Sequence, residues 1–201
     1  ATLARWGGLD VLFCNAGVAG EICPVVDYPE DVFDRVMAVN VRGPFLGCKY
    51  ALAKMRDGGS IVITSSVVGT TSDPGIAAYA ASKHALEGFF KSLRFEIKSF
   101  NIKVSVVEPG FFKTNLHHAF EFATPSISDY DTIRTNALEV FSNSINNAPT
   151  PEPVAEAILK ILHSKNPRFS YRIGSDAKTL PFLQFAFNRL FEIGTARKFK
   201  L

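Results

Sequence analysis

Residues 60–66 read Ser60-Ile61-Val62-Ile63-Thr64-Ser65-Ser66, and residues 77–83 read Ala77-Ala78-Tyr79-Ala80-Ala81-Ser82-Lys83. The first stretch is an apolar run that ends in hydroxyl side chains, which predicts a buried strand with Ser66 just beyond its carboxyl end. The second stretch is rich in alanine, which favours a helix. A turn containing glycine, serine and proline separates the two. A strand, a turn and a helix in this order form the repeating unit of a parallel α/β sheet.

Tyr79 and Lys83 are the candidate catalytic pair. Positions i and i+4 share a helix face, so the Lys83 ammonium is expected near the Tyr79 hydroxyl. A nearby positive charge favours phenolate, which predicts a pKa of Tyr79 below its ordinary value of about 10. Ligands bind at the carboxyl ends of strands in open α/β sheets, so Ser66 is expected to face the same site. The Tyr-x-x-x-Lys spacing alone indicates two ordinary side chains on the exposed face of one helix. With Ser66 added, the three residues form a candidate catalytic site.

Length and composition restrict the class of protein. The 201 residues, of which 47% are hydrophobic and 20% charged, are typical of one globular domain. The net charge of +3 comes from dispersed basic residues, which argues against a nucleic-acid partner. Three cysteines without metal-ligand spacing, and the lack of a transmembrane run or signal-peptide pattern, predict a reduced, cytoplasmic protein.

Short apolar runs alternate with helical patterns along the chain. This alternation predicts right-handed crossovers and a doubly wound parallel sheet of about four strands. The predicted strands are Leu9–Cys14, Ser60–Thr64, Lys103–Val107 and Phe169–Gly174. Helices are predicted from Pro29, from Gly43-Pro44 to about Met55, around Tyr79, and from Thr150-Pro151-Glu152.

Two segments carry many of the 18 phenylalanines. Residues 111–148 are aromatic, rich in Asn and Ser and without a strand pattern, which predicts a substrate loop or lid. Residues 179–201 form an aromatic, amphipathic tail. Packing of this tail over a substrate pocket or against a partner subunit is favoured over a membrane-surface helix. The phenylalanines also suggest a lipophilic substrate.

Five motifs resemble those of the short-chain dehydrogenase/reductase (SDR) family in order and spacing. They are Asn15-Ala16-Gly17, Asn40 within Val39-Asn40-Val41, Ser66, the Tyr79/Lys83 pair, and Pro109-Gly110 followed by Thr114. The resemblance extends from Trp6 to about His163. It implies a Rossmann-like fold and hydride transfer between NAD or NADP and a carbonyl or secondary alcohol.

The resemblance also implies roles for four residues in catalysis. Tyr79 would donate or accept the proton at the substrate oxygen. Lys83 would lower the pKa of Tyr79 and bind the nicotinamide ribose. Ser66, favoured over Ser65 by its spacing to Tyr79, would bind the substrate carbonyl. Asn40 would hold a water in the proton relay to Lys83, although in isolation it reads as a helix cap.

Six further positions would contact the cofactor by the same resemblance. Pro109, Gly110 and Thr114 would line the nicotinamide and pyrophosphate. Asn15, Ala16 and Gly17 would support the adenosine side. The family's Gly-x-x-x-Gly-x-Gly turn, which binds the pyrophosphate, does not occur in this sequence. The chain is therefore interpreted as a single, N-terminally truncated domain spanning residues 1–201, with Leu9–Cys14 as an edge strand.

Because the Gly-rich turn is absent from the sequence, functions other than an active oxidoreductase stay open. A catalytically incompetent fragment could act as a binding or oligomerising module, since helices at about 41–55 and 77–99 commonly form homodimer or homotetramer contacts in the family. An epimerase or dehydratase relative would use the same fold. His117, His118 and Glu121 could suggest a metal site, but a solvated polar turn is favoured and no metal is predicted.

Overall fold

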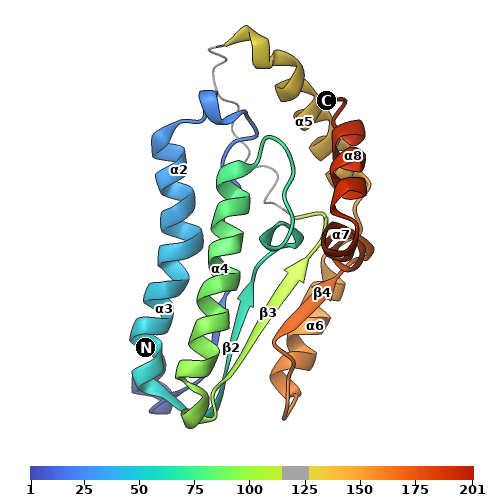
Figure 1. Ribbon diagram of the computed structural model, residues 1–201. Helices are drawn as coiled ribbons and strands as arrows, with labels where there is room; N and C mark the ends of the chain where they lie inside the picture. The colour runs from blue at the N-terminus through green and yellow to red at the C-terminus, as the bar shows by residue number, and fades with distance from the viewer. Residues whose placement is uncertain (115–126) are drawn as a thin grey trace.

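The computed structural model describes residues 1–114 and 127–201 and contains a parallel four-stranded sheet (Figure 1). Its order is β1-β2-β3-β4, with all neighbours parallel. The strands are β1 (Leu9–Cys14), β2 (Met55–Thr64), β3 (Lys103–Pro109) and β4 (Ser170–Ile173). Phe13 pairs with Val62, Val62 with Ser105, and Val106 with Ser170. The predicted α/β fold, its four strands and the edge position of β1 are therefore confirmed.

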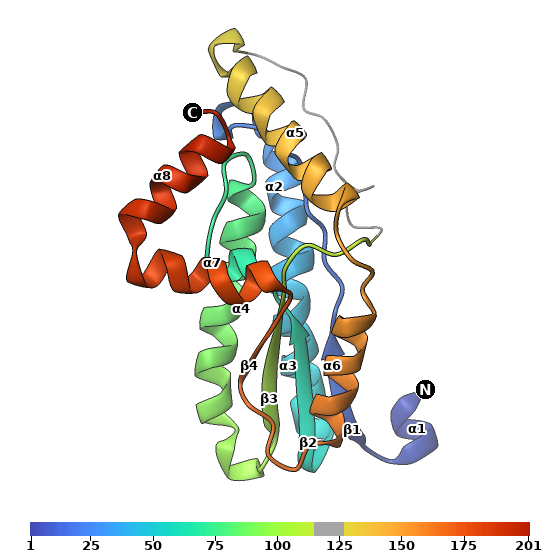
Figure 2. The ribbon, with the colours of Figure 1, turned by 90° about the vertical axis from the view of Figure 1, so that its right-hand side faces the viewer.

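Helices cover both faces of the sheet (Figures 1 and 2). One face carries α2 (Glu30–Met37), α3 (Gly43–Ala51) and α4 (Ala77–Glu96), and the other carries α6 (Glu152–His163). Beyond the carboxyl ends of the strands lie α5 (Asp131–Asn146), α7 (Ser175–Ala186) and α8 (Asn188–Lys198), while α1 (Thr2–Trp6) stands apart beside β1. Short 3₁₀ turns occupy Val25–Asp27, Leu52–Lys54, Val67–Gly69, Lys98–Phe100 and Ser128–Tyr130.

The alternation of side chains along β2 explains why this strand reads as a continuous apolar run. Ile61 and Ile63 are fully buried against α3 and α4, where Phe90 is also fully buried. Val62 points to the opposite face and packs with Ile161 of α6. Because each face of the strand is covered by helices, neither set of side chains can be polar.

A single helical run joins α2 to α3, which corrects the prediction that Gly43-Pro44 separates two helices. Residues Ala38–Arg42 form a π-helical turn between them. The Gly43 N–H reaches back to the Ala38 carbonyl, so the wider turn passes directly into α3. Pro44 has no N–H, so this continuous run lacks one main-chain hydrogen bond at that position. Asn40 lies inside this turn, so its alternative interpretation as a helix cap is wrong.

Two predicted segments contain helices that the sequence pattern did not reveal. The segment 111–148 contains α5, and the tail from residue 179 is divided between α7 and α8. His117, His118, Glu121, Phe120 and Phe122 lie outside the described residues. No helix among the described residues combines the length and the apolar character that a membrane crossing requires.

Candidate active site

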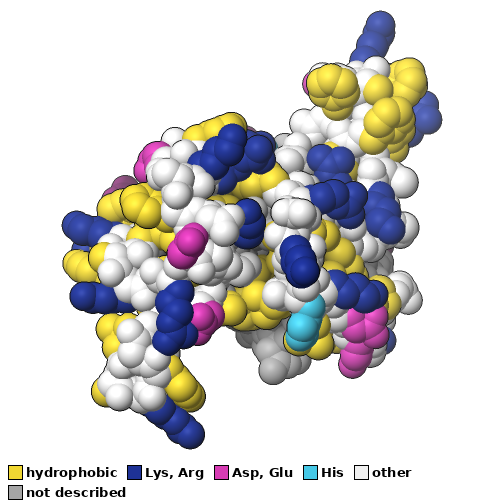
Figure 3. Space-filling view, turned by 90° about the horizontal axis from the view of Figure 1, so that it is seen from below, with side chains coloured by type: hydrophobic (Ala, Val, Ile, Leu, Met, Phe, Trp, Pro, Cys, Tyr) yellow, Lys and Arg dark blue, Asp and Glu magenta, His cyan; other side chains and the backbone are white. Residues whose placement is uncertain are grey.

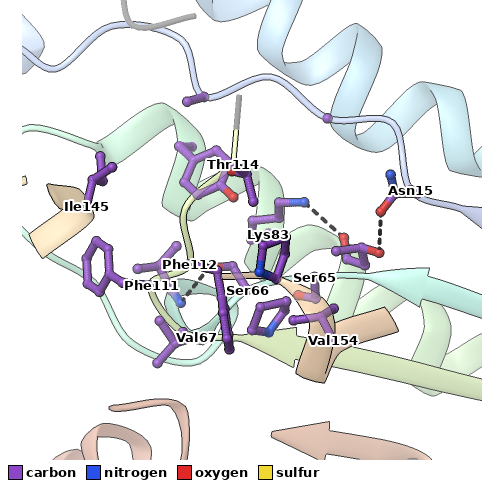
Figure 4. Close-up of a pocket in the computed structure, with 18 of the residues that line it drawn as sticks. Asn15, Ser65, Ser66, Val67, Lys83, Phe111, Phe112, Thr114, Ile145 and Val154 are labelled. Carbon is purple, nitrogen blue, oxygen red and sulfur yellow. Dashed lines mark hydrogen bonds between the residues drawn. The ribbon is translucent and has the colours of Figure 1, made fainter. Parts of the chain in front are cut away.

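A cavity of about 860 Å³ lies at the carboxyl ends of β1, β2 and β3. Figure 4 shows side chains from the strand ends, α4 and the loop after β3 lining it. Nine of the ten predicted site residues line the cavity, namely Asn15, Ala16, Gly17, Ser66, Tyr79, Lys83, Pro109, Gly110 and Thr114. The tenth, Asn40, lies behind the wall. The sheet therefore brings together positions that are up to 99 residues apart in sequence, from Asn15 to Thr114.

Lys83 is buried and is oriented by the end of β2. Its Nζ donates a hydrogen bond to the Thr64 carbonyl at 3.0 Å and lies 5.5 Å from the centroid of the Tyr79 ring (Figure 4). Burial lowers the pKa of Lys83 to about 8, while the carboxylate of Glu87 acts in the opposite direction. An ammonium has three donors, so two remain to serve the cavity or a bound ligand.

Tyr79 differs from the sequence prediction in its acidity. Burial raises the pKa of Tyr79 to about 12, and a hydrogen bond with the Ser66 side chain opposes this shift. The expected lowering by Lys83 is wrong: the Lys83 ammonium donates to the Thr64 carbonyl, and loss of hydration dominates the pKa of Tyr79. At neutral pH Tyr79 is therefore a neutral phenol that can donate its proton.

Ser66 caps the 3₁₀ turn that follows β2. Its Oγ accepts a hydrogen bond from the Val68 N–H at 3.4 Å, which fixes the side chain at the start of the turn. The same hydroxyl hydrogen-bonds to Tyr79. Ser65 is buried, and its main-chain N–H donates to the Val107 carbonyl at 2.8 Å. The geometry thus places the Ser66 hydroxyl beside the phenol, as its spacing predicts.

The Asn40 side chain ties the loop after β1 to α4. Its Oδ1 accepts from the Val18 N–H at 2.8 Å, and its Nδ2 donates to the Val18 carbonyl at 2.8 Å and to Ser82 Oγ at 2.9 Å. A Cβ on Gly17 would lie 3.4 Å from Asn40 Oδ1 and 3.6 Å from Lys83 Nζ, so Gly17 lies beside both side chains. Both N–H donors of the Asn40 side chain are therefore used within the protein, while Oδ1 keeps a second acceptor lone pair.

Two further contacts join elements around the cavity. Thr64 Oγ1 donates to Asn15 Oδ1 at 2.8 Å and so joins the ends of β1 and β2. The Phe111 N–H donates to Asp176 Oδ2 at 2.7 Å, which joins the loop after β3 to α7. A Cβ on Gly110 would collide with the Asp176 carboxylate, so only glycine allows this close approach.

Part of the apolar wall of the cavity comes from α5, a helix that the sequence pattern did not reveal. Phe141 and Ile145 of α5 line the cavity, together with Val154 of the predicted helix α6. Phe111 packs on Phe141 at 6.2 Å between ring centroids. The four-residue spacing of Ala137, Phe141 and Ile145 was the available signal, and polar residues around it concealed the helix.

Two buried carboxylates, one on α4 and one on β3, were not predicted from the sequence. Glu108 of β3 accepts hydrogen bonds from Ser170 Oγ and from Arg172 Nε, the latter at 3.2 Å. Glu87 of α4 is buried one turn beyond Lys83. Burial raises the pKa of Glu87 to about 7, and the neighbouring Glu108 adds to this shift. Glu87 therefore changes charge near neutral pH.

A Glu87→Gln variant is expected to make folding less dependent on pH. In the folded chain Glu87 keeps its proton up to about pH 7, whereas the ordinary pKa is 4.5. The free energy of unfolding of the natural chain therefore falls as pH rises between these values. The neutral amide avoids this loss, so the variant should be more stable at pH 7.5 by about 1 to 2 kcal/mol and similar at pH 4.5. Urea denaturation at both values measures the difference.

Glu96→Gln, an exposed change on the same helix, is the matched control. It should leave the pH dependence unaltered. If the free energy of unfolding of Glu87→Gln varied with pH between 4.5 and 7.5 as it does in the natural chain, Glu87 would have an ordinary pKa in the folded chain. Measurements stay below pH 8 because Lys83 also titrates in the folded chain near that value. Its lowered pKa makes the free energy of unfolding rise with pH above about 8.

Sequence comparisons agree with the motifs in the cavity. The profile of the family described as short chain dehydrogenase matches residues 1–123. Momilactone A synthase from Oryza sativa subsp. japonica is 42% identical over 120 residues, which are 58% of this chain and 44% of that protein. The chain spans about half the length of the curated relatives that it matches.

Structural comparisons extend the likeness over the whole fold. A short-chain dehydrogenase from Streptomyces avermitilis superimposes with a TM-score of 0.80 at 30% identity, covering 98% of this chain and 71% of that one. The landomycin C-6 ketoreductase LanV, solved with NADP and rabelomycin, has a TM-score of 0.52 at 36% identity, covering 55% of this chain and 46% of that one. The chain therefore belongs to the short-chain dehydrogenase family.

Proposed function

We propose that this protein is an NAD(P)-dependent oxidoreductase that interconverts a carbonyl and a secondary alcohol on a lipophilic substrate in the cytoplasm. The observation that carries the proposal is the convergence of Ser66, Tyr79 and Lys83 at one cavity. A phenol, a hydroxyl and an ammonium are the groups that a carbonyl oxygen needs as it gains negative charge and a proton.

The residues around the cavity are suited to a nicotinamide cofactor. Lys83 has two donors left after its bond to Thr64, which fits the hydroxyls of a ribose. Gly17, Gly110 and Thr114 line the same cavity. The cofactor would supply or accept the hydride, and LanV, which shares this fold, was solved with NADP.

The chain's own residues would manage the proton and the developing charge. In reduction, Tyr79 would donate its proton to the substrate oxygen while the Ser66 hydroxyl donates a hydrogen bond to the same oxygen. Lys83, whose Nζ lies 5.5 Å from the centroid of the Tyr79 ring, would bind the cofactor ribose beside the phenol. The apolar wall formed by Phe111, Phe141 and Ile145 favours a hydrophobic substrate and excludes water from the reacting atoms.

A second candidate is a non-catalytic binding or oligomerising module. A groove between the α2–α3 run and α4 is lined by Met37, Val41, Phe45 and Phe89. Phe45 is exposed there, and exposed apolar grooves serve as association surfaces. A homodimer or homotetramer formed through these helices would be compatible with either function.

Titration of the 201-residue chain with NADH and NADPH, followed by nicotinamide fluorescence, tests the proposal. Saturable binding of either cofactor is expected for the natural chain and also for Tyr79→Phe, which keeps the cavity wall. A screen of lipophilic ketones and aldehydes should then show turnover by the natural chain. If a cooperatively folded chain binds neither cofactor, the enzyme proposal fails and the oligomerising module becomes the working function.

A further inference from the structure

Helices α7 and α8 form a hairpin, here called the C-terminal hairpin (residues 175–201), whose aromatic side chains are largely exposed. Phe185 is 91% exposed, Leu190 65% and Phe182 59%. Phe182 and Phe187 contact each other across the bend at 6.4 Å between ring centroids. The expected packing of the whole tail over the pocket is therefore not found for these side chains. An apolar patch of this kind on a surface indicates an interaction site.

The base of the hairpin is fixed to the body while its tip is not. Ala177 and Phe199 are fully buried, and Phe199 packs on Phe141 of α5 at 5.9 Å. Lys200 forms an ion pair with Glu139 at 2.8 Å. Figure 2 shows α7 and α8 projecting together away from the sheet, with the bend between them farthest out. The exposed aromatic side chains thus lie at the end of an anchored projection.

Basic side chains accompany this apolar tip. The hairpin contains five basic residues and two acidic ones. The acidic groups point to internal partners, since Asp176 accepts from the Phe111 N–H and Glu192 accepts from Asn188 Nδ2 at 2.8 Å. In Figure 3 the hairpin is the projection at the upper right, where hydrophobic and Lys/Arg side chains lie side by side. The positive charges that face outward include Lys178, Arg189 and Arg197.

We propose that the C-terminal hairpin docks on an anionic lipid bilayer surface. Phe182, Phe185, Phe187 and Leu190 would enter the boundary between headgroups and acyl chains, and the basic side chains would contact the anionic headgroups. Aromatic and leucine side chains next to Lys and Arg are the composition of segments that lie in the plane of the membrane interface. The docking is peripheral and is independent of the proposed chemistry at the cavity.

Charge argues for a bilayer over a second copy of the chain as the occupant. A two-fold contact through this hairpin would bring two surfaces with the same excess of positive charge together, and like charges at short range repel. An anionic surface instead complements the excess of positive charge. The patch also lies at a bend between two short helices, which presents a convex tip rather than the flat face of a helix pair.

Co-sedimentation of the whole chain with vesicles tests the proposal. Phosphatidylcholine vesicles containing about a third phosphatidylserine should bind the chain, and pure phosphatidylcholine vesicles should bind it far more weakly. Phe185→Ser is expected to reduce the partition coefficient about tenfold, because one buried phenyl ring is lost from the bilayer. Arg189→Glu should reduce it about tenfold on the anionic vesicles alone, and added salt should weaken binding of the natural chain.

Phe95→Ser is the matched control, since Phe95 is 68% exposed on α4, away from the hairpin. It should bind vesicles like the natural chain, and circular dichroism should show all three variants folded. Equal binding to neutral vesicles, or binding that Phe185→Ser leaves intact, would overturn the proposal. So would an oligomeric mass in vesicle-free solution that falls in Phe185→Ser, because a second copy would then be the occupant.

Discussion

Tyr79→Phe is expected to reduce the carbonyl-reducing activity by about 10² to 10⁴-fold, the range typical for loss of a general acid. The change removes one oxygen and leaves the ring that lies beside Lys83. Because the hydroxyl acts on the oxygen only as it becomes negative, kcat and kcat/KM should fall together. Nicotinamide absorbance with a ketone found in the screen measures both constants.

Tyr50→Phe is a suitable control because Tyr50 is 68% exposed on α3 and does not line the cavity. Its kinetic constants should match those of the natural chain. Cofactor titration of Tyr79→Phe separates loss of chemistry from loss of binding, and it should show unchanged affinity. An activity within a few-fold of the natural value would mean that another group supplies the proton.

Asn40→Ala is expected to lower the free energy of unfolding by about 3 kcal/mol. The substitution removes three hydrogen bonds of a fully buried side chain and leaves the partly buried N–H and carbonyl of Val18 without their partner. Each buried group left unsatisfied costs roughly 1 to 3 kcal/mol. Urea denaturation monitored by circular dichroism gives the loss directly. The loop bearing Asn15, Ala16 and Gly17 should also lose its attachment to α4, so cofactor affinity should fall.

Asn147→Ala provides a matched comparison on the surface. Its side chain donates one exposed hydrogen bond to the Asn143 carbonyl at 2.9 Å, so its removal should change stability by less than about 1 kcal/mol. If Asn40→Ala were equally mild, the loop after β1 would have to find other partners in the variant. The dependence of the free energy of unfolding on urea concentration should be the same in both variants. Equal values would show that the substitutions change stability without changing the surface exposed on unfolding.

Most strands and helices were predictable because the order of apolar and polar residues in the sequence determines which side chains are buried. The continuous apolar run around Ile61 requires cover on both faces, and the alanine-rich stretch around Tyr79 has no competing strand signal. The spacing of Tyr79, Lys83 and Ser66 was sufficient to bring them to one cavity, because strand ends and the next helix face the same edge of the sheet.

Other features depend on competition between partners that a pattern does not reveal. The i, i+4 spacing places Lys83 near the Tyr79 ring, but the Thr64 carbonyl decides where the ammonium points. The sign of the Tyr79 pKa shift then depends on whether hydration or charge dominates. Helix α5 was hidden for a related reason, since polar residues interrupt its apolar positions, and the partners of those positions come from distant segments such as Ile22, Val67 and Phe199.

The π-helical turn has a consequence for the angular position of side chains around the helix. Buried positions along the α2–α3 run recur every four residues, at Val32, Val36, Asn40, Pro44 and Cys48. In an ideal α-helix of 3.6 residues per turn, each such step overshoots by about 40°, so the row would reach the far side of the helix after four steps. A wider turn takes up part of this rotation. The extra width at Asn40 is thus a correction of helical phase, which allows one continuous helix to keep the same side toward the protein from α2 to α3.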